Sequence, residues 1–343
     1  MTSVALFNNK GGVGKTTLTY HLAHMLRRLG LRVLAVDLDP QANLTAMCLD
    51  EYEIEELWEN PSELIAQGAA PRRPAGGGRV RAGQTIADAV RPILEGTGDI
   101  ARVEPAALQP GLWLLPGSLD LSRFEDKLSS EWFKTFAGDI AAIRTTTAFH
   151  RIVDAAADAV EADIVLIDVG PNLGAINRAA LIAADTVLMP LAADLFSLKG
   201  LSNLGPTLRE WRRDWQQLVL PRIPAGFPAP RADMRPIGYV IMQPEMRLDR
   251  PVKAYERWLE RIPGVYAAAV LGGRPPAAED GAHRIATLRN YRSLMPLSHD
   301  ARKPMFDLKP ADGALGSTQK YVQTCFREFR GLAEAVLDRV DKS

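Results

Sequence analysis

Cysteine is nearly absent from this sequence: among 343 residues only Cys48 and Cys325 occur. Their spacing matches neither a metal-binding motif nor a disulfide framework, so we expect two reduced thiols in a cytoplasmic protein. An excess of either charge is also lacking, because 41 Lys and Arg residues balance 41 Asp and Glu residues. The chain is therefore not a generally basic nucleic-acid binder, and any contact with DNA needs a local basic patch.

Long hydrophobic runs are lacking as well. The longest apolar region, residues 179–196, is interrupted by Asp185, Pro190 and Asp194, so it does not predict a membrane-spanning helix. An apolar run at residues 4–7 follows the first residue almost directly. We therefore expect neither a secretory leader nor a helix-turn-helix region ahead of it, and no site-specific autorepression.

The sequence does contain short apolar runs that are separated by helical patterns. Apolar strands that alternate with helices form a parallel sheet buried on both faces. We therefore predict an α/β fold: a single doubly wound, mostly parallel sheet flanked by helices, in one domain over residues 1–343. The predicted strands contain residues 4–7, 33–36, 164–167, 186–189 and 237–241.

The most informative segment is the glycine-rich stretch at residues 10–17. It lies between a predicted strand and a predicted helix, which is the context in which such loops bind nucleotide phosphates. Lys15 would reach the β- and γ-phosphates, and the Thr16 hydroxyl would ligate Mg²⁺. The general motif has glycine where this chain has Asn9, and an extra lysine, Lys10, lies inside the loop. The backbone cradle for phosphate oxygens is predicted at Gly11, Gly12, Val13 and Gly14.

Carboxylates end two of the predicted strands. Asp37 and Asp39 follow the second strand, and Asp168 ends the third. Because the carboxyl ends of parallel strands meet at one edge of a sheet, these side chains are predicted beside the glycine-rich loop. Asp37 and Asp39 can hold Mg²⁺ through water and orient an attacking water, and Asp168 is the expected Mg²⁺ partner of Thr16.

Together these segments closely resemble the ParA/MinD family of deviant phosphate-loop ATPases, and ParA-type partition ATPases in particular. The resemblance covers nearly the whole chain apart from an insertion at about residues 50–84. It implies the fold of a deviant phosphate-loop NTPase. The matching segments are residues 8–17, 36–41, 114–118, 167–168, 181–201 and 288–304.

The resemblance assigns a role to each polar residue of the loop. Lys10 is the signature lysine, which reaches across an ATP-sandwich dimer to the phosphates of the partner subunit. There it neutralises charge that develops during transfer, as an arginine finger does. Lys15 and Thr16 keep the general roles of the phosphate loop, and Thr17 hydrogen-bonds the α-phosphate.

Roles outside the loop are implied in the same way. Asp39 is the water-orienting residue, and Asp37 supports the metal. The chain departs from the family at Asn9, where glutamine is common, and at Gly170, where the family often has a first proline before Pro171. Neither departure removes a charge that catalysis needs. Contacts with adenine are implied at Met242, Gln243 and Pro296.

Members of this family differ in output, and the sequence separates some of them. The redox branch needs cysteines that bridge a dimer around a cluster, which Cys48 and Cys325 do not match. The membrane branch uses a basic amphipathic C-terminal helix. Here the amphipathic helix predicted at residues 318–340 ends in a charge-balanced tail, so we expect it to dock onto the body and expect no membrane contact.

A local basic excess remains. Residues 199–261 contain 12 basic and 7 acidic residues, which suits non-specific binding of DNA. A solvated charged helix surface explains the excess about equally well. The candidate DNA contacts are Arg212, Arg213, Arg247, Arg250, Lys253 and Arg257.

The insertion is the segment that the resemblance does not explain. It opens with an acidic block, and a basic stretch at residues 71–79 follows. This pattern predicts an acidic solvated helix and then a mobile surface loop, with a partner-docking insertion as the alternative.

These observations predict an ATP hydrolase that uses ATP and Mg²⁺, dimerises around two ATP molecules and binds DNA non-specifically. It would be cytoplasmic, and associated with the nucleoid when ATP is bound. A ParB-like or other adaptor protein would stimulate hydrolysis and couple it to partition of a plasmid, a chromosome or another cargo. The alternatives are a nucleotide-gated scaffold with little turnover and a membrane-associated regulator of the MinD kind.

Overall fold

An eight-stranded sheet forms the centre of the protein, whose computed structural model describes residues 1–59, 79–242, 252–273, 282–291 and 293–341. The strand order is β3-β4-β2-β5-β1-β6-β7-β8. Neighbouring strands pair in parallel, except that β3 and β4 are antiparallel. The strands are β1 (Thr2–Leu6), β2 (Val33–Asp37), β3 (Ala106–Gln109), β4 (Leu112–Leu115), β5 (Ile164–Asp168), β6 (Thr186–Ala192), β7 (Arg235–Met242) and β8 (Arg284–Leu288).

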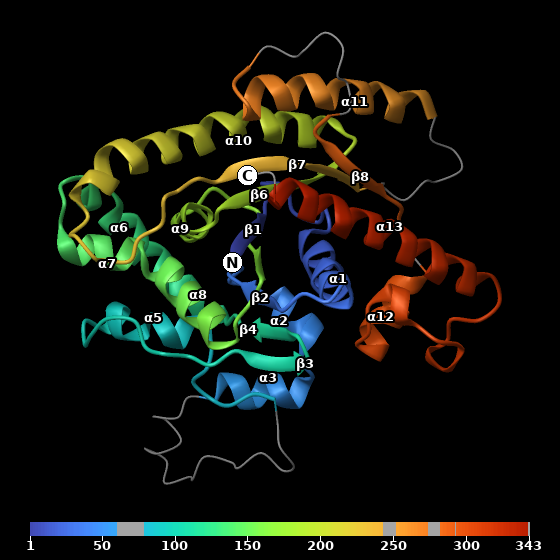
Figure 1. Cartoon of the computed structure of the whole chain (residues 1–343), viewed down its shortest axis with the longest axis horizontal. Helices are drawn as coiled ribbons and strands as arrows, with labels where there is room; N and C mark the ends of the chain where they lie inside the picture. The colour runs from blue at the N-terminus through green and yellow to red at the C-terminus, as the bar shows by residue number, and fades with distance from the viewer. Residues whose placement is uncertain (60–78, 243–251, 274–281, 292, 342–343) are drawn as a thin grey trace.

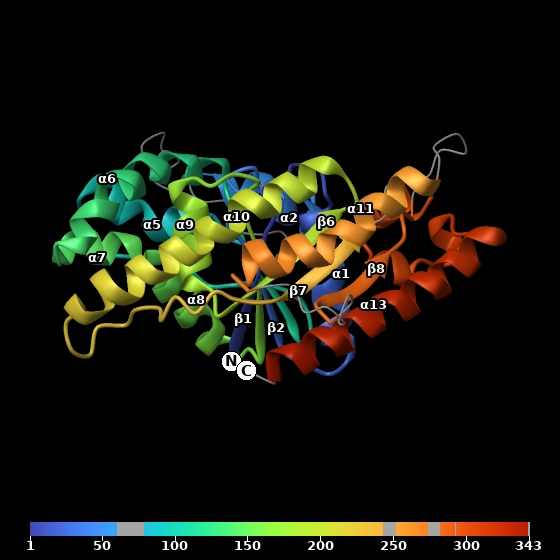
Figure 2. The same ribbon diagram turned by 90° about the horizontal axis from the view of Figure 1, so that it is seen from above.

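Helices cover both faces of this sheet (Figure 1). One layer contains α1, α2, α12 and α13, and the other contains α5 to α11. In the second layer α10 and α11 lie side by side, as Figure 2 shows from above. The helices are α1 (Lys15–Arg28), α2 (Asn43–Cys48), α3 (Glu51–Trp58), α5 (Ile86–Glu95), α6 (Phe124–Phe136), α7 (Ile140–Thr146), α8 (Ala148–Ala159), α9 (Ala175–Ala183), α10 (Leu195–Asp214), α11 (Val252–Val265), α12 (Leu294–Ala301) and α13 (Ser317–Asp341).

Side chains of the central strands alternate between two separate cores. In and just after β1, Val4 and Leu6 join the core under α1 and α13, whereas Ala5 and Phe7 join the core under α8 and α9. Burial on both faces explains why these strands are continuous apolar runs. The predicted doubly wound, mostly parallel sheet is confirmed, and all five predicted strands form; β3, β4 and β8 had not been predicted.

The acidic block folds as predicted into a helix, but this helix is not wholly solvated. Asp50 caps α3 and exchanges hydrogen bonds with Glu53, which satisfies the first free backbone N–H groups. Leu57 is only 1% exposed, and the Trp58 indole donates to the carbonyl of Gly117 at 3.2 Å. One face of α3 is therefore docked on the body. Of the mobile loop predicted at residues 71–79, only Arg79 is described, and it pairs with Glu53 of α3.

The C-terminal helix docks onto the body, as the sequence predicted. Leu332, Val336 and Val340 are buried in the core that α13 shares with α1 and β8. Its apolar face is thus covered by protein. Within the described ranges, no helix is long and apolar enough to cross a membrane.

A buried histidine joins the first helix to the C-terminal part of the chain. The Nδ1 of His21 donates to the carbonyl of Thr17 at 2.7 Å, and Nε2 accepts from the backbone N–H of Met305 at 3.0 Å. The ring packs against Phe329, with centroids 5.1 Å apart. One donor and one acceptor define a neutral imidazole, and burial lowers the pKa of His21 to about 4.

This histidine predicts acid sensitivity. An unfolded histidine has a pKa of about 6.5, so protonation favours the unfolded chain as the pH falls from about 6.5 towards 4. The loss attributable to His21 is about 2 kcal/mol by pH 5. His21→Gln keeps a donor and an acceptor but does not titrate. Between pH 7.5 and 5, its free energy of unfolding, measured by urea titration, should therefore fall by about 2 kcal/mol less than that of the wild type. His299→Gln, at a side chain that is 71% exposed, is the control; equal pH dependence of the two variants would contradict the assignment.

Candidate functional site

The glycine-rich loop connects the end of β1 to α1, which begins at Lys15. Gly12 and Gly14 have φ angles of 70° and 90°, in the left-handed region that glycine enters at no steric cost. This backbone turns the loop around the helix N-terminus, where N–H groups and the helix dipole favour an anion. Lys15 is 7% exposed, and its Nζ lies 3.4 Å from the carbonyl of Lys10. Burial lowers the pKa of Lys15, and the charges of Asp168 and Asp39 partly offset this.

Two of the predicted carboxylates lie next to each other behind the loop. Asp37 and Asp168 are register partners at the ends of β2 and β5, and both are fully buried. Burial raises the pKa of Asp37 to about 7, although hydrogen bonds from Thr45 oppose the shift. Burial, and then the charge of Asp37, raise the pKa of Asp168 to about 8. The pair therefore favours a proton or a cation between β2 and β5.

The two carboxylates differ in what they offer a metal. Asp37 Oδ2 accepts from the backbone N–H and the hydroxyl of Thr45, at 2.8 and 2.7 Å. Asp168 Oδ1 accepts from Thr19 at 3.3 Å, but its buried Oδ2 has no partner. The free oxygen of Asp168 fits a divalent cation, whereas Asp37 is already engaged and positions α2. Direct ligation by Asp37 stays a prediction.

A magnesium site here needs the nucleotide to complete it. In the part of the chain that the structure describes, no group of three or more His, Cys, Asp or Glu side chains is placed to hold a metal ion. Mg²⁺ is commonly bound by one or two protein ligands together with phosphate oxygens and water. Thr16 and Asp168 fit that pattern.

Asp39 faces the phosphate side of the loop. Its Oδ1 accepts from the backbone N–H of Gln41 at 3.0 Å, and a Cβ placed on Gly170 would lie 3.3 Å from it. Gly170 itself is held by the Asn177 side chain, which bonds both its N–H and its carbonyl. The glycine that departs from the family pattern therefore lets the loop after β5 approach Asp39 closely. The Glu125 carboxylate of α6 caps the start of α9 behind this loop.

Two hollows flank the phosphate loop, and both contact Gly12, Gly14, Thr17 and Met295. The larger, of about 590 Å³, is lined by Lys15, Thr16 and Asp39 but not by the buried pair Asp37 and Asp168, and is called the phosphate-side hollow. The other, of about 390 Å³, is called the base-side hollow. Besides the shared residues, the phosphate-side hollow is lined by Gly11, Lys15, Thr16, Asp39, Gln41, Asn43, Ala46, Met47, Pro171 and His299.

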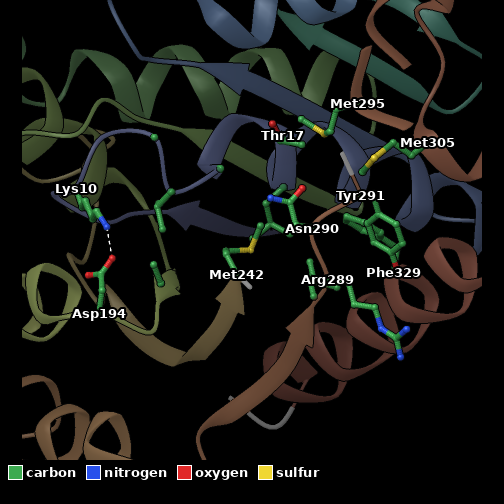
Figure 3. A pocket seen from close by; sticks show the side chains of 16 residues that line it. Lys10, Thr17, Asp194, Met242, Arg289, Asn290, Tyr291, Met295, Met305 and Phe329 are labelled. Carbon is green, nitrogen blue, oxygen red and sulfur yellow. Dashed lines mark hydrogen bonds and ion pairs between the residues drawn. The ribbon is translucent and has the colours of Figure 1, made fainter. Parts of the chain in front are cut away.

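The base-side hollow has mainly apolar walls. Figure 3 shows Asn290 near its middle, between Met242 and Met305, while the Arg289 side chain projects away. Of the predicted base contacts, Met242 lines this hollow, Gln243 lies outside the described residues, and Pro296 is exposed on α12. Its neighbour Met295 is the α12 residue that lines both hollows. The other base-side residues are Lys10, Val13, Leu18, Ala192, Asp194, Leu288, Tyr291 and Phe329.

Lys10 is paired within the chain. Its ammonium contacts the Asp194 carboxylate and lies 5.9 Å from the centre of the Phe196 ring. Partial burial opposes ionisation of Asp194, but the hydrogen bonds from Lys10 and Ser197 hold the pKa of Asp194 below its usual value. The two side chains remain 30% and 35% exposed. Lys10 is thus held at the rim of the base-side hollow.

The predicted DNA contacts are only partly described. Arg212 is half-buried, and Arg213 is paired with Asp214 at 3.0 Å at the end of α10. Exposed Arg257 stacks on Trp258 of α11, 4.5 Å from the ring centre, and Arg261 lies 5.3 Å from the same ring. The remaining candidates, Arg247 and Arg250 and the side chain of Lys253, lie outside the described structure.

Sequence reasoning missed several residues that shape the site. Asp194 has a recognisable signal, because it precedes a helix and its side chain accepts from the Ser197 N–H as an N-cap. Thr45 and Asn177 carry no such signal in the sequence. Thr45 bonds Asp37 at the end of β2, and Asn177 bonds Gly170 in the loop after β5, and only the fold brings these partners together.

Comparisons with known proteins identify the family of this chain. A family model described as an AAA domain matches residues 1–219. A probable plasmid-partitioning protein ParA from Thermus thermophilus is 30% identical over 284 residues, which are 82% of this chain and 69% of that protein. The chromosome-partitioning ATPase Soj of the same organism is 32% identical over 209 residues, 61% of this chain and 62% of that protein.

A solved structure shares the fold over almost the full length. The McdA–ATP complex from Cyanothece superposes with a TM-score of 0.59 at 15% identity, covering 98% of this chain and 96% of that one. This chain spans less than two thirds of the length of several curated relatives that it matches. The extent of the family match and the ParA relative nevertheless place it: the chain belongs to the ParA/MinD family of deviant phosphate-loop ATPases.

Proposed function

We propose that this protein is a Mg²⁺-dependent ATPase of the partition type. The observation that carries the proposal is the phosphate loop with buried Lys15, which lies between a base-side and a phosphate-side hollow. A nucleoside triphosphate that filled both hollows would lie across the phosphate loop. Relatives named as a chromosome-partitioning ATPase and as a probable plasmid-partitioning protein support this activity.

Different residues of the site would bind the phosphates, hold the metal and activate the water. Lys15 and the loop N–H groups bind phosphate oxygens, and Thr16 and Asp168 hold Mg²⁺. The metal, when bound, neutralises charge on the phosphates. Asp39, at the wall of the phosphate-side hollow, orients the attacking water and accepts its proton. Gly170 leaves the space in which Asp39 and that water meet.

Self-association would complete the site. Lys15 would bind the phosphates of the nucleotide in its own subunit, so Lys10 is available to contact a nucleotide bound by a second copy. Its side chain is 30% exposed and forms an ion pair with Asp194. That ion pair would break when the Lys10 ammonium binds a phosphate group instead. We therefore propose an ATP-dependent homodimer in which each Lys10 contacts the partner's phosphates.

The proposed output is movement of DNA or another cargo. The ATP-bound dimer would bind DNA non-specifically through basic side chains such as Arg257, and would thus be associated with the nucleoid. An adaptor protein of the ParB kind would stimulate hydrolysis and release the dimer. One domain over residues 1–343, with an insertion at about residues 50–84, would carry all of these steps.

One observation favours a second candidate, a nucleotide-gated scaffold with little turnover. Trp58 donates to the Gly117 carbonyl, the Gly117 N–H donates to the Thr45 hydroxyl at 2.8 Å, and that hydroxyl donates to Asp37. The helix that opens the insertion is thus linked to the carboxylate pair. A variant lacking residues 60–78 discriminates: lost binding of the adaptor, with unchanged ATP and DNA binding, would favour the scaffold.

Two substitutions test the catalytic assignments. Asp39→Ala should still bind ATP but hydrolyse it at least about 100-fold more slowly, because the water loses its base. Lys15→Ala should lose ATP binding itself. Calorimetry measures binding, and phosphate release measures turnover. Exposed Asp126→Ala is the matched control and should behave as wild type; wild-type turnover of Asp39→Ala would refute its role.

DNA binding is tested by a mobility-shift assay over a salt series with and without ATP. We expect a shift that needs ATP and weakens steeply with salt, because bound phosphates release counterions. Arg257→Ala should reduce the slope of log affinity against log salt by about 1 for each phosphate that the arginine neutralises. Arg330→Ala, an arginine 55% exposed on α13, should leave the slope unchanged. A shift that ignores ATP would count against the proposed cycle.

A further inference from the structure

A carboxylate on the C-terminal helix holds the loop that follows β8. Glu328 of α13 accepts a hydrogen bond from the Tyr291 hydroxyl at 2.5 Å and one from the backbone N–H of Arg289 at 3.3 Å. Its other oxygen pairs with the Arg289 guanidinium at 3.0 Å. One side chain therefore fixes both ends of a three-residue segment.

That segment forms a wall of the base-side hollow. Arg289, Asn290 and Tyr291 all line it. The guanidinium of Arg289 is drawn outward to Glu328, which leaves the Asn290 side chain as the polar group in the middle of the hollow (Figure 3). Tyr291 is 5% exposed, so its hydroxyl depends on Glu328 for a partner. Without the carboxylate, a buried hydroxyl would lose its hydrogen bond.

The helix beneath Glu328 is itself rigidly placed. The next residue, Phe329, is 2% exposed, lines the same hollow, and packs against Phe306 and His21. His21 in turn bonds the carbonyl of Thr17 in the phosphate-loop helix. Glu328 therefore stands on an element whose position is fixed relative to the phosphate loop, which is what a group that sets the geometry of a site requires.

We infer that Glu328 is a positioning residue for the base-side wall of the nucleotide site, and that it acts through Arg289 and Tyr291 to present Asn290 to the base. The inference rests on the proposed function in one respect, that the ligand is a nucleotide. The hydrogen bonds and ion pair described for Glu328 involve Arg289 and Tyr291, and not the phosphate loop or the predicted metal residues. Its contribution is therefore to binding of the base, and the phosphates do not depend on it.

The test compares two ligands whose difference is the nucleoside. Glu328→Ala should weaken binding of Mg-ATP about tenfold and leave binding of inorganic tripolyphosphate within about twofold, since only the base meets the altered wall. Glu328→Gln keeps an acceptor for Tyr291 but loses the charge that holds Arg289, so a smaller loss of about threefold is expected. Calorimetry on the full chain measures both ligands.

Two further variants make the result specific. Glu334→Ala removes a carboxylate from the same helix that is 52% exposed and paired with Arg330, and should change neither affinity. Tyr291→Phe should weaken ATP binding on its own but add little in the Glu328→Ala background, because both changes remove the same hydrogen bond. If Glu328→Ala fails to fold, Glu328→Gln and Tyr291→Phe carry the comparison.

The outcomes separate the inference from the proposed function. Equal weakening of ATP and tripolyphosphate would overturn the positioning role, because it would show a general effect on the fold or the phosphate loop. Unchanged ATP affinity in Glu328→Ala would overturn it as well, while leaving the ATPase proposal intact. If the wild-type protein bound Mg-ATP no more tightly than tripolyphosphate, the result would overturn both the positioning role of Glu328 and the proposal that the ligand is a nucleotide.

Discussion

Asp37 and Asp168 lie side by side at the ends of neighbouring parallel strands, removed from water, with Lys15 as the nearby counter-charge. Two buried carboxylates that cannot both ionise freely are costly for a protein to keep. The surrounding backbone is built to hold them. A Cβ on Gly117 would lie 3.0 Å from Asp37, and Gly170 makes room beside Asp39 in the same way. The pair thus favours a proton or a cation, and the backbone around it leaves room for the carboxylates.

The parts of this arrangement that follow from the phosphate loop and from the ends of parallel strands could be predicted. The phosphate loop and the strand-end carboxylates follow from residue order, because a parallel sheet brings the ends of its strands to one edge. The strands β3, β4 and β8 could not. β3 and β4 have only four residues each, and β3 and β8 carry exposed or half-buried residues on both faces, so their strand character comes from the neighbours they pair with.

The interactions that tune the site were beyond sequence reasoning for a different reason. Lys10 meets Asp194 and Glu125 caps α9 across long stretches of chain, and the Glu328–Tyr291 bond joins a helix to a loop. In a sequence, a carboxylate on the polar side of an amphipathic helix gives no sign of whether it faces water or bonds a neighbouring loop. The amphipathic pattern at residues 318–340 accordingly predicted that α13 docks onto the body, but not that its polar side reaches the base-side wall.

The position of Met295 at both hollows has a mechanical consequence. A molecule that lay across the phosphate loop and under α12 would touch the first helix and the last third of the chain at once. It would hold together two parts of the native fold that are far apart in the sequence, and it would stabilise the folded chain alone, because the unfolded chain has no such site. The free energy of unfolding would then rise with the logarithm of the concentration of that ligand, once the concentration exceeds the dissociation constant.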